Sequence, residues 1–369
     1  NGGGAGSGIY RTLDGGKTWT RLEEGIPNGH LGRIGLDIYQ KDGNVLVASI
    51  EARRGQTGVY GSVDRSDSWT FLSDTNPRPM YFSMVRIDPN DPERIYLGGQ
   101  NLMRSDDGGR TFSDDGARNV HLDHHALWID PENSSHLLLG SDGGLSVSFD
   151  RSENWRFYDN LPISQFYEIG LDQRSPFWVC GGLQDNGSWC GPSKTLDSQG
   201  IRNADWINIS GGDGFYVKID PENPNTIFSE SQNGRIGLLN LETGERSSIA
   251  PRPLFSTDEG SLPRKEHPSD QDIKSDDREY RFNWNTPLLL SEDDSRSVYL
   301  GAQMLLKTTD NGTSWTQVSP DLTYNIDRSQ LPIMDEFPSD SMLSMHDGVS
   351  FYSTLTTMDE SSLDTDIFY

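Results

Sequence analysis

The stretch TLDGGKTW (Thr12–Trp19) decides the fold, because its pattern returns several times along the chain. SDDGGRTF (Ser105–Phe112) and TTDNGTSW (Thr308–Trp315) repeat it closely, and SVDRSDSW (Ser62–Trp69) and SFDRSENW (Ser148–Trp155) repeat it in a weaker form. Asp, Gly and Ser favour turns, and the aromatic residue that follows them suits the start of a strand. The repeat therefore predicts a series of tight hairpins.

The aspartates of these hairpins have a structural explanation. The carboxylate can accept N–H groups of its own turn, the glycine takes a positive φ angle, and the tryptophan packs between neighbouring sheets. We therefore predict a structural role for five aspartates: Asp14, Asp64, Asp107, Asp150 and Asp310.

A second pattern, in which a turn joins two apolar strands, sets the period of the repeat. Examples are VRIDPNDPERIYLGG (from Val85) and LWIDPENSSHLLLGS (from Leu127). The series continues near Ser291 and near Asp364. The clearest turn aspartates recur 42 to 51 residues apart, at Asp37, Asp88, Asp130, Asp172 and Asp220. Seven repeats of this length predict an all-β, seven-bladed β-propeller with four strands in each blade.

The ends of the chain fit the same scheme. The chain begins on a third strand and ends where a second strand starts, so we expect both ends to complete one blade of a single propeller over residues 1–369. Polar insertions interrupt the period at about 250–281 and 319–350, and such long loops act as lids, docking arms or disordered segments. The open ends also indicate an excerpt of a larger, multi-propeller protein.

The hairpin repeats resemble the Asp-box (BNR) family of β-propellers, which includes sialidases, sortilin-type receptors and glycosidases that cut xyloglucan. The segments GGLQDNGSW (from Gly181), GGDGFYV (from Gly211) and RFNWNTP (from Arg281) look most like secreted bacterial BNR-repeat glycosyl hydrolases. The resemblance covers essentially the whole chain and implies a carbohydrate-active protein. A sialidase is disfavoured, because the Phe-Arg-Ile-Pro element of that family is missing.

Composition narrows the range of partners. The formal net charge is −25 and the sequence pI is about 4.5, so the surface repels nucleic acid and anionic lipid. No apolar run approaches 18 residues, so a membrane span is not expected. Hydrophobic residues make up only 33% of the chain, which suits short strands and tight turns better than packed helices. We expect an extracellular or periplasmic protein without a cofactor.

Unusual residues gather in one of the two sets of loops. In each blade, the loop between the second and third strands and the crossing into the next blade lie at the same end of the strands. We call this end the loop face. Examples are SDGG (Ser141–Gly144), LQDNGSW (Leu183–Trp189) and NISGGDGFYV (Asn208–Val217). Ligands commonly bind to such loops when a rigid frame holds them together.

Three aspartates of the loop face are candidate catalytic residues: Asp142, Asp185 and Asp213. Glycoside hydrolysis needs two carboxyl groups, one of which its surroundings keep protonated. The segment that contains Asp142 is similar to the Asp-x-Gly-Gly loop that carries a catalytic aspartate in the xyloglucan-cutting family. The alternative for each residue is a carboxylate that caps its own turn.

Seven further residues of the loop face are candidate ligand-binding residues: His124, His125, Gln184, Asn186, Glu230, Asn283 and Trp284. His121, His124, His125 and Asp123 could also bind a divalent metal. Consecutive strand residues point to opposite faces, however, so His124 and His125 cannot easily share one ion. We therefore predict no metal site.

Cys180 and Cys190 flank the loop around Asp185 symmetrically, so a hairpin would place them opposite each other. In an exported protein we expect them to form a disulfide. Two functions remain open at this point. One is a secreted glycoside hydrolase that acts on a polysaccharide, and the other is a non-catalytic, sortilin-like propeller that binds a peptide or protein partner.

Overall fold

The computed structural model describes residues 3–161, 163–251, 280–291, 294, 296–332, 335, 337–339, 342–343 and 352–369. The chain forms two compact units. Unit 1 comprises Asn1–Ile163 and Pro332–Asp347, and unit 2 comprises Ser164–Leu331 and Gly348–Tyr369. Most of the insertion predicted at about 250–281, and much of the one predicted at 319–350, lies outside the described residues.

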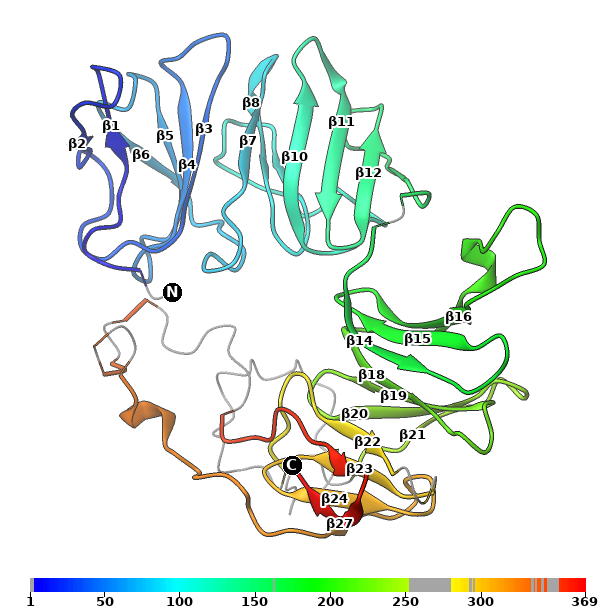
Figure 1. Cartoon of the computed structure of the whole chain (residues 1–369). Helices are drawn as coiled ribbons and strands as arrows, with labels where there is room; N and C mark the ends of the chain where they lie inside the picture. Colours follow the sequence, from blue (N-terminus) through cyan, green and yellow to red (C-terminus); the bar gives the residue numbers. More distant parts are fainter. Residues whose placement is uncertain are drawn as a thin grey trace, which may run out of the picture. The chain divides into compact units, whose positions relative to one another are not determined.

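Unit 1 is a succession of antiparallel sheets (Figure 1). A two-stranded sheet consists of β1 (Tyr10–Arg11) and β2 (Thr20–Arg21). A four-stranded sheet follows, made of β3 (Ile34–Ile38), β4 (Leu46–Ile50), β5 (Gly58–Ser62) and β6 (Thr70–Ser73). The next has three strands, β7 (Val85–Asp88), β8 (Asp91–Leu97) and β9 (Met103–Ser105). The last has four, β10 (His124–Asp130), β11 (Asn133–Ser141), β12 (Gly144–Ser148) and β13 (Arg156–Phe157).

Unit 2 repeats this organisation with three four-stranded sheets. The first is made of β14 (Phe166–Leu171), β15 (Trp178–Leu183), β16 (Gly187–Pro192) and β17 (Ile207–Ser210). The second is made of β18 (Gly214–Ile219), β19 (Thr226–Ser231), β20 (Arg235–Asn240) and β21 (Arg246–Ser248). The third is made of β22 (Leu288–Leu290), β23 (Val298–Gly301), β24 (Leu305–Thr308) and β25 (Thr316–Gln317). A final pair is β26 (Glu360–Ser361) and β27 (Asp364–Phe368).

The strand order confirms the predicted fold class. In every sheet each strand pairs with the strand that precedes or follows it in the chain, which is the topology of a propeller blade. The structure is thus all-β and of the propeller class. The count of seven blades, and the completion of one blade by β26–β27 and β1–β2, stay predictions.

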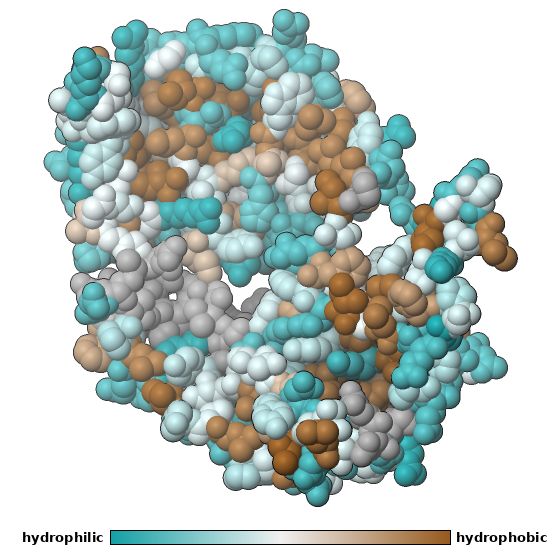
Figure 2. Space-filling model, in the orientation of Figure 1, coloured by the Kyte–Doolittle hydropathy of each residue, from teal (hydrophilic) through white to brown (hydrophobic). Residues whose placement is uncertain are grey.

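One strand can contribute side chains to two hydrophobic cores, because its side chains alternate between the two faces of the sheet. In β8, Ile95 and Leu97 pack with Val59 and other residues of the preceding sheet, whereas Tyr96 packs with Leu137 and its neighbours in the following sheet. All five side chains are almost completely buried. Since successive residues of a strand point to opposite faces, the second strand of a blade is apolar on both sides. Hydrophilic residues are frequent along the outer edges of the surface in view, and hydrophobic residues are visible between them (Figure 2).

The hairpin aspartates have the structural role that the repeat predicts. The Asp107 carboxylate accepts hydrogen bonds from the backbone N–H groups of Arg110 (3.0 Å) and Thr111 (2.9 Å), and from the hydroxyl groups of Ser105 (2.8 Å) and Thr111 (2.6 Å). These bonds hold the pKa of Asp107 far below its usual value, chiefly through the contacts of Thr111. The aspartate therefore closes its own turn.

The weaker hairpin copies keep the turn without its glycines. Gly108 and Gly109 have φ angles of 71° and 88°, and the residues at the same places in SVDRSDSW are Arg65 (61°) and Ser66 (68°). The hydrogen-bonded turn thus imposes a left-handed backbone on residues that rarely adopt it. One expectation fails in the first copy, where the Trp19 side chain is 61% exposed in place of being packed between sheets.

Replacing Asp310 by alanine is expected to lower the melting temperature by about 2–6 °C, because Ser314 and Thr308 lose their acceptor. Hydrogen bonds from Ser314 lower the pKa of Asp310 to about 2. The stabilisation is therefore complete above about pH 4 and disappears as the pH falls toward 2. Thermal unfolding at pH 7 and pH 2 tests this, with exposed Asp366→Ala as control. Equal losses for both variants would contradict it.

Candidate active site

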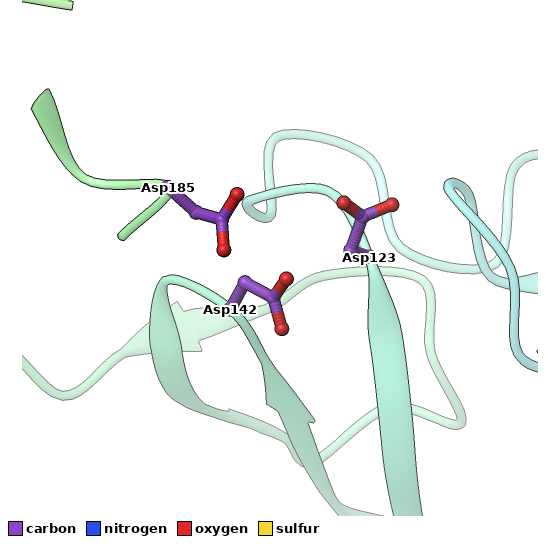
Figure 3. Close-up of side chains that lie close together, drawn as sticks. All are labelled: Asp123, Asp142 and Asp185. Carbon is purple, nitrogen blue, oxygen red and sulfur yellow. The ribbon is translucent and has the colours of Figure 1, made fainter. Parts of the chain in front are cut away.

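Unit 1 brings two carboxylates together at its loop face. Asp123 immediately precedes β10 and Asp142 immediately follows β11, and the Asp142 N–H donates to the Asp123 carbonyl at 3.3 Å (Figure 3). Oxygen atoms of the two side chains lie within 4.8 Å of each other. We call Asp123 and Asp142 the carboxylate pair. The third side chain drawn in Figure 3, Asp185, belongs to unit 2 and is described with that unit.

His125 joins the carboxylate pair through a bulge in β10. His124 pairs with Ser141 and Ala126 with Gly140, so His125 is the extra residue between them. Such bulges redirect a side chain and occur often beside active sites. The His125 Nε2 atom lies 3.3 Å from an oxygen of Asp142.

Aromatic rings hold the His125 imidazole in place. The ring of Tyr81 contacts it edge-on, with centroids 5.5 Å apart, and the ring of Phe82 lies 5.2 Å away. The Arg78 guanidinium lies 4.6 Å from the centroid of the Tyr81 ring, and the Arg33 guanidinium donates a hydrogen bond to the Tyr81 carbonyl at 2.7 Å. Arg78, Tyr81 and Phe82 all come from the crossing between β6 and β7.

The two members of the carboxylate pair differ in electrostatic surroundings. Burial raises the pKa of Asp123, the negative charge of Asp142 raises it further, and Arg78 opposes the rise. One Asp123 oxygen is buried without a hydrogen-bond partner. Asp142 in contrast has His125 as a partner. Different surroundings of this kind separate the roles of an acid and a base.

The turn that carries Asp142 requires a glycine next to it. A Cβ atom on Gly143 would lie only 2.4 Å from the Cβ atom of His121. The sequence GG after Asp142 is therefore explained by the close approach of the segment that precedes β10. This packing keeps the β11–β12 turn against the segment that carries Asp123.

Equivalent positions in other sheets have a different role. Glu51 follows β4 and accepts a hydrogen bond from the Arg33 N–H at 2.8 Å, and Gln303 follows β23 and accepts one from the Arg281 N–H at 2.8 Å. Both side chains thus hold in place the segment that leads into the first strand of their own sheet. Asp142, which like Glu51 is the first residue after the second strand of its sheet, contacts the His125 side chain. This departure from the repeat marks Asp142 as a functional candidate.

His124 does not face the carboxylate pair. Its side chain is 1% exposed, and neither ring nitrogen has a hydrogen bond of normal geometry. Burial lowers its pKa to about 4, so the imidazole is neutral near pH 7. The bulge thus separates a buried histidine from His125, which is half exposed. The structure places His125, and not His124, where a ligand can reach it.

In unit 2, Asp213 fastens the turn that carries Asp185. The Asp213 carboxylate accepts hydrogen bonds from the Asp185 N–H (2.7 Å) and from the Gln232 side chain (3.0 Å), and it is 5% exposed. The Gly187 N–H also donates to the Gly212 carbonyl at 2.7 Å. Both carboxylate oxygens of Asp213 are therefore engaged in positioning a neighbouring loop.

A disulfide and two hydrogen bonds also fix the β15–β16 turn. Cys180 pairs directly with Cys190 and forms the predicted disulfide. The Trp189 indole N–H donates to the Asn186 carbonyl at 2.7 Å, and the Asn186 side chain donates to the Gln184 carbonyl at 2.8 Å. These contacts restrict the conformation of the turn.

Glu230 is placed below the loop face and not on it. Its side chain is fully buried, one oxygen accepts a hydrogen bond from the Thr286 N–H at 3.3 Å, and the other has no partner. Burial raises the pKa of Glu230 well above its usual value. Burial is the main cause of a raised pKa at Tyr216, and the charges of Glu168 and Glu230 raise that pKa further. Contact with a large ligand would need this part of unit 2 to open.

The last two predicted ligand residues lie in the crossing before β22. Asn283 donates a hydrogen bond to the Thr354 hydroxyl at 3.0 Å, and Trp284 is partly exposed while its carbonyl accepts a bond from the Asn233 N–H at 3.2 Å. Asn283 thus binds the C-terminal segment. Trp284 remains accessible to a ligand.

Replacing Asp213 by alanine is expected to lower stability by about 1–3 kcal/mol, because the buried Asp185 N–H loses its acceptor. Hydrogen exchange of the amides in residues 184–187 should accelerate more than exchange in β20. Asp213→Asn is the matched control, since its amide oxygen can still accept from Asp185. Unchanged exchange in the alanine variant would contradict the positioning role.

The comparisons with known proteins give distant likenesses. No family model matches the chain. The oligoxyloglucan reducing-end-specific xyloglucanase of Emericella nidulans is 26% identical over 165 residues, a segment that covers 39% of this chain and 19% of that protein. The matched segment therefore spans only about a fifth of the length of this relative. No helix among the described residues is long and apolar enough to cross a membrane.

Solved structures with a similar arrangement include the GH74 enzyme of Niastella koreensis (TM-score 0.35, 13% identity, 85% of this chain and 63% of that one). The GH74 xyloglucanase of Xanthomonas campestris gives a TM-score of 0.33 at 13% identity and covers 98% of this chain and 47% of that one. YCF48 from Cyanidioschyzon merolae gives 0.27 at 14%, over 79% and 87%. None of these likenesses assigns a role to a residue of this chain.

Proposed function

We propose that this chain is part of a carbohydrate-active propeller protein that hydrolyses a glycosidic bond at the carboxylate pair of unit 1. The observation that supports this most directly is the contrast between the two carboxyl groups. Asp123 is partly buried and has a raised pKa, whereas Asp142 lies beside His125. Glycosidases separate acid and charge-stabilising roles in this way.

Each side chain then has a stated role. Asp123 donates a proton to the oxygen of the leaving sugar, and the Asp142 carboxylate stabilises the positive charge that develops at the anomeric carbon. His125 orients Asp142, and the partly exposed Tyr81 ring contacts the sugar. Water then adds to the anomeric carbon and gives its proton to the Asp123 carboxylate, which restores the acid and completes the hydrolysis.

The distant xyloglucanase relative supports a neutral plant polysaccharide as the first substrate to test. The disulfide between Cys180 and Cys190 supports an oxidising, extracytoplasmic location, because disulfides persist in such compartments. The strongly acidic surface supports a neutral rather than an anionic polymer, since like charges repel.

The test is product release from a panel that contains xyloglucan, mixed-linkage glucan, xylan and polygalacturonate, followed by mass spectrometry. Wild type is compared with the double variant Asp123→Asn/Asp142→Asn and with Asp114→Asn, an exposed control in the same unit. Cleavage by wild type and the control, and none by the double variant, is the expected result. Equal cleavage by the double variant would refute the site. No cleavage of any polymer by wild type would favour a binding protein.

A further inference from the structure

The bulge that places His125 has a counterpart in unit 2. In β14, Phe166 pairs with Leu183 and Glu168 pairs with Gly182, so Tyr167 is the extra residue between them. In β10 the same position, one residue after the first paired residue, is occupied by His125. Two sheets of the chain thus carry an aromatic ring or imidazole at the same bulged position of the first strand.

The turn between the second and third strands, which carries Asp142 in unit 1, also has a counterpart in unit 2. Asp142 is the first residue after β11, in a turn of two residues that separates Ser141 from Gly144. The β15–β16 turn (Gln184–Asn186) has three residues between Leu183 and Gly187, and its carboxylate, Asp185, is the second. The Gln184 N–H donates to the Gln165 carbonyl at 3.0 Å, which holds this turn beside the bulge.

The Tyr167 ring is supported on one side. It stacks on the buried ring of Phe215, with centroids 4.8 Å apart and an angle of 23° between the planes, and it is 37% exposed. Phe215 itself lies in the irregular start of β18, where Gly214 pairs with Ser231 and Val217 with Ser229. A flat aromatic surface fixed in this way is suited to the C–H face of a sugar ring.

The polar groups beside Tyr167 favour an uncharged ligand. Glu168 and Asp185 provide carboxylates, and Gln184 and Asn186 provide amides. The segments 165–168, 184–186 and 211–213 contain no lysine or arginine. Carboxylates and amides bind sugar hydroxyl groups, whereas a uronate would be repelled by the carboxylates and would meet no cation in these segments.

We propose that Tyr167 and the β15–β16 turn form a glycan-binding subsite in unit 2 that takes a neutral sugar ring and rejects anionic sugars. The sugar lies on Tyr167, and its hydroxyl groups bond to Asp185 and Asn186. The disulfide and Asp213 hold these groups in place before the ligand arrives, which reduces the entropy lost on binding. The subsite rests on the proposed function for its ligand class, but its binding does not require cleavage.

Isothermal titration calorimetry tests the subsite. The full chain with Asp123→Asn and Asp142→Asn, which prevents turnover, is titrated with xyloglucan oligosaccharides and with oligogalacturonate. In this background, Tyr167→Ala is expected to weaken binding of the neutral oligosaccharide by about tenfold or more, and Tyr167→Phe by less than about threefold. Phe177→Ala, which removes an exposed ring at the opposite end of the same sheet, should leave the affinity unchanged. Melting temperatures show whether each variant is folded.

The outcomes separate the subsite from the proposed catalysis. Affinity unchanged by Tyr167→Ala in a folded variant, or equally tight binding of oligogalacturonate, would overturn the subsite while cleavage by wild type could still stand. Binding that depends on Tyr167 in a protein that cleaves nothing would support the subsite and refute the hydrolase. No binding of the neutral oligosaccharides would overturn the subsite.

Discussion

Asp142→Asn is expected to lower kcat for polysaccharide cleavage by about 10³-fold or more, because the charge that stabilises the transition state is removed. The substitution keeps the size of the side chain, and the Asp142 N–H bond to the Asp123 carbonyl does not involve the carboxylate. Binding of the oligosaccharide should change by much less than kcat. Initial rates across a range of substrate concentrations measure both quantities.

A substrate with a good leaving group distinguishes the two carboxylates. The nitrophenolate of a nitrophenyl glycoside departs without needing a proton from the enzyme. Such a substrate should therefore restore most of the activity of Asp123→Asn but little of that of Asp142→Asn. The raised pKa of Asp123 also predicts that activity on the natural polymer falls as the pH rises through that pKa, and that Asp123→Asn loses this limb of the profile. Equal restoration of both variants would contradict the assigned roles.

Glu230→Gln is expected to stabilise the protein at alkaline pH, by several degrees in melting temperature. Burial raises the pKa of Glu230 in the folded state, so folding favours its neutral form. The contribution of Glu230 is therefore fully favourable below pH about 4.5 and is lost as the pH rises toward the folded-state pKa. Glutamine stays neutral at every pH and avoids this loss.

Thermal unfolding at pH 4 and pH 8 measures the effect. The two proteins should melt alike at pH 4, and the variant should melt higher at pH 8. Glu245→Gln, at an exposed position, controls for the change in net charge. A variant that is less stable than wild type at pH 8 would show that Glu230 is ionised and paired in the folded protein.

Local patterns made the fold readable from the sequence. The hairpin repeats predicted the turns correctly, because each aspartate bonds mainly to residues within four positions of itself, as Asp107 does with Thr111. The alternation of Ile95, Tyr96 and Leu97 likewise follows from strand geometry alone. The disulfide was predictable because Cys180 and Cys190 are equidistant from one turn.

The site was predictable only in part, since its partners come from different sheets. Asp142 stood out through its Asp-Gly-Gly turn, but its neighbours Tyr81 and Phe82 belong to the preceding crossing, and nothing in their local sequence specifies the contact with His125. Bulges were missed for a similar reason. A bulge depends on the register between two strands, which the sequence of one strand does not reveal.

The double-sided strand β8 has a consequence for how unit 1 comes apart. Because Tyr96 belongs to the core of the following sheet and Ile95 to that of the preceding one, neither sheet can detach without exposing apolar surface on β8. The stability of each sheet therefore includes its contacts with the neighbouring sheet, so opening one sheet also destabilises the next one.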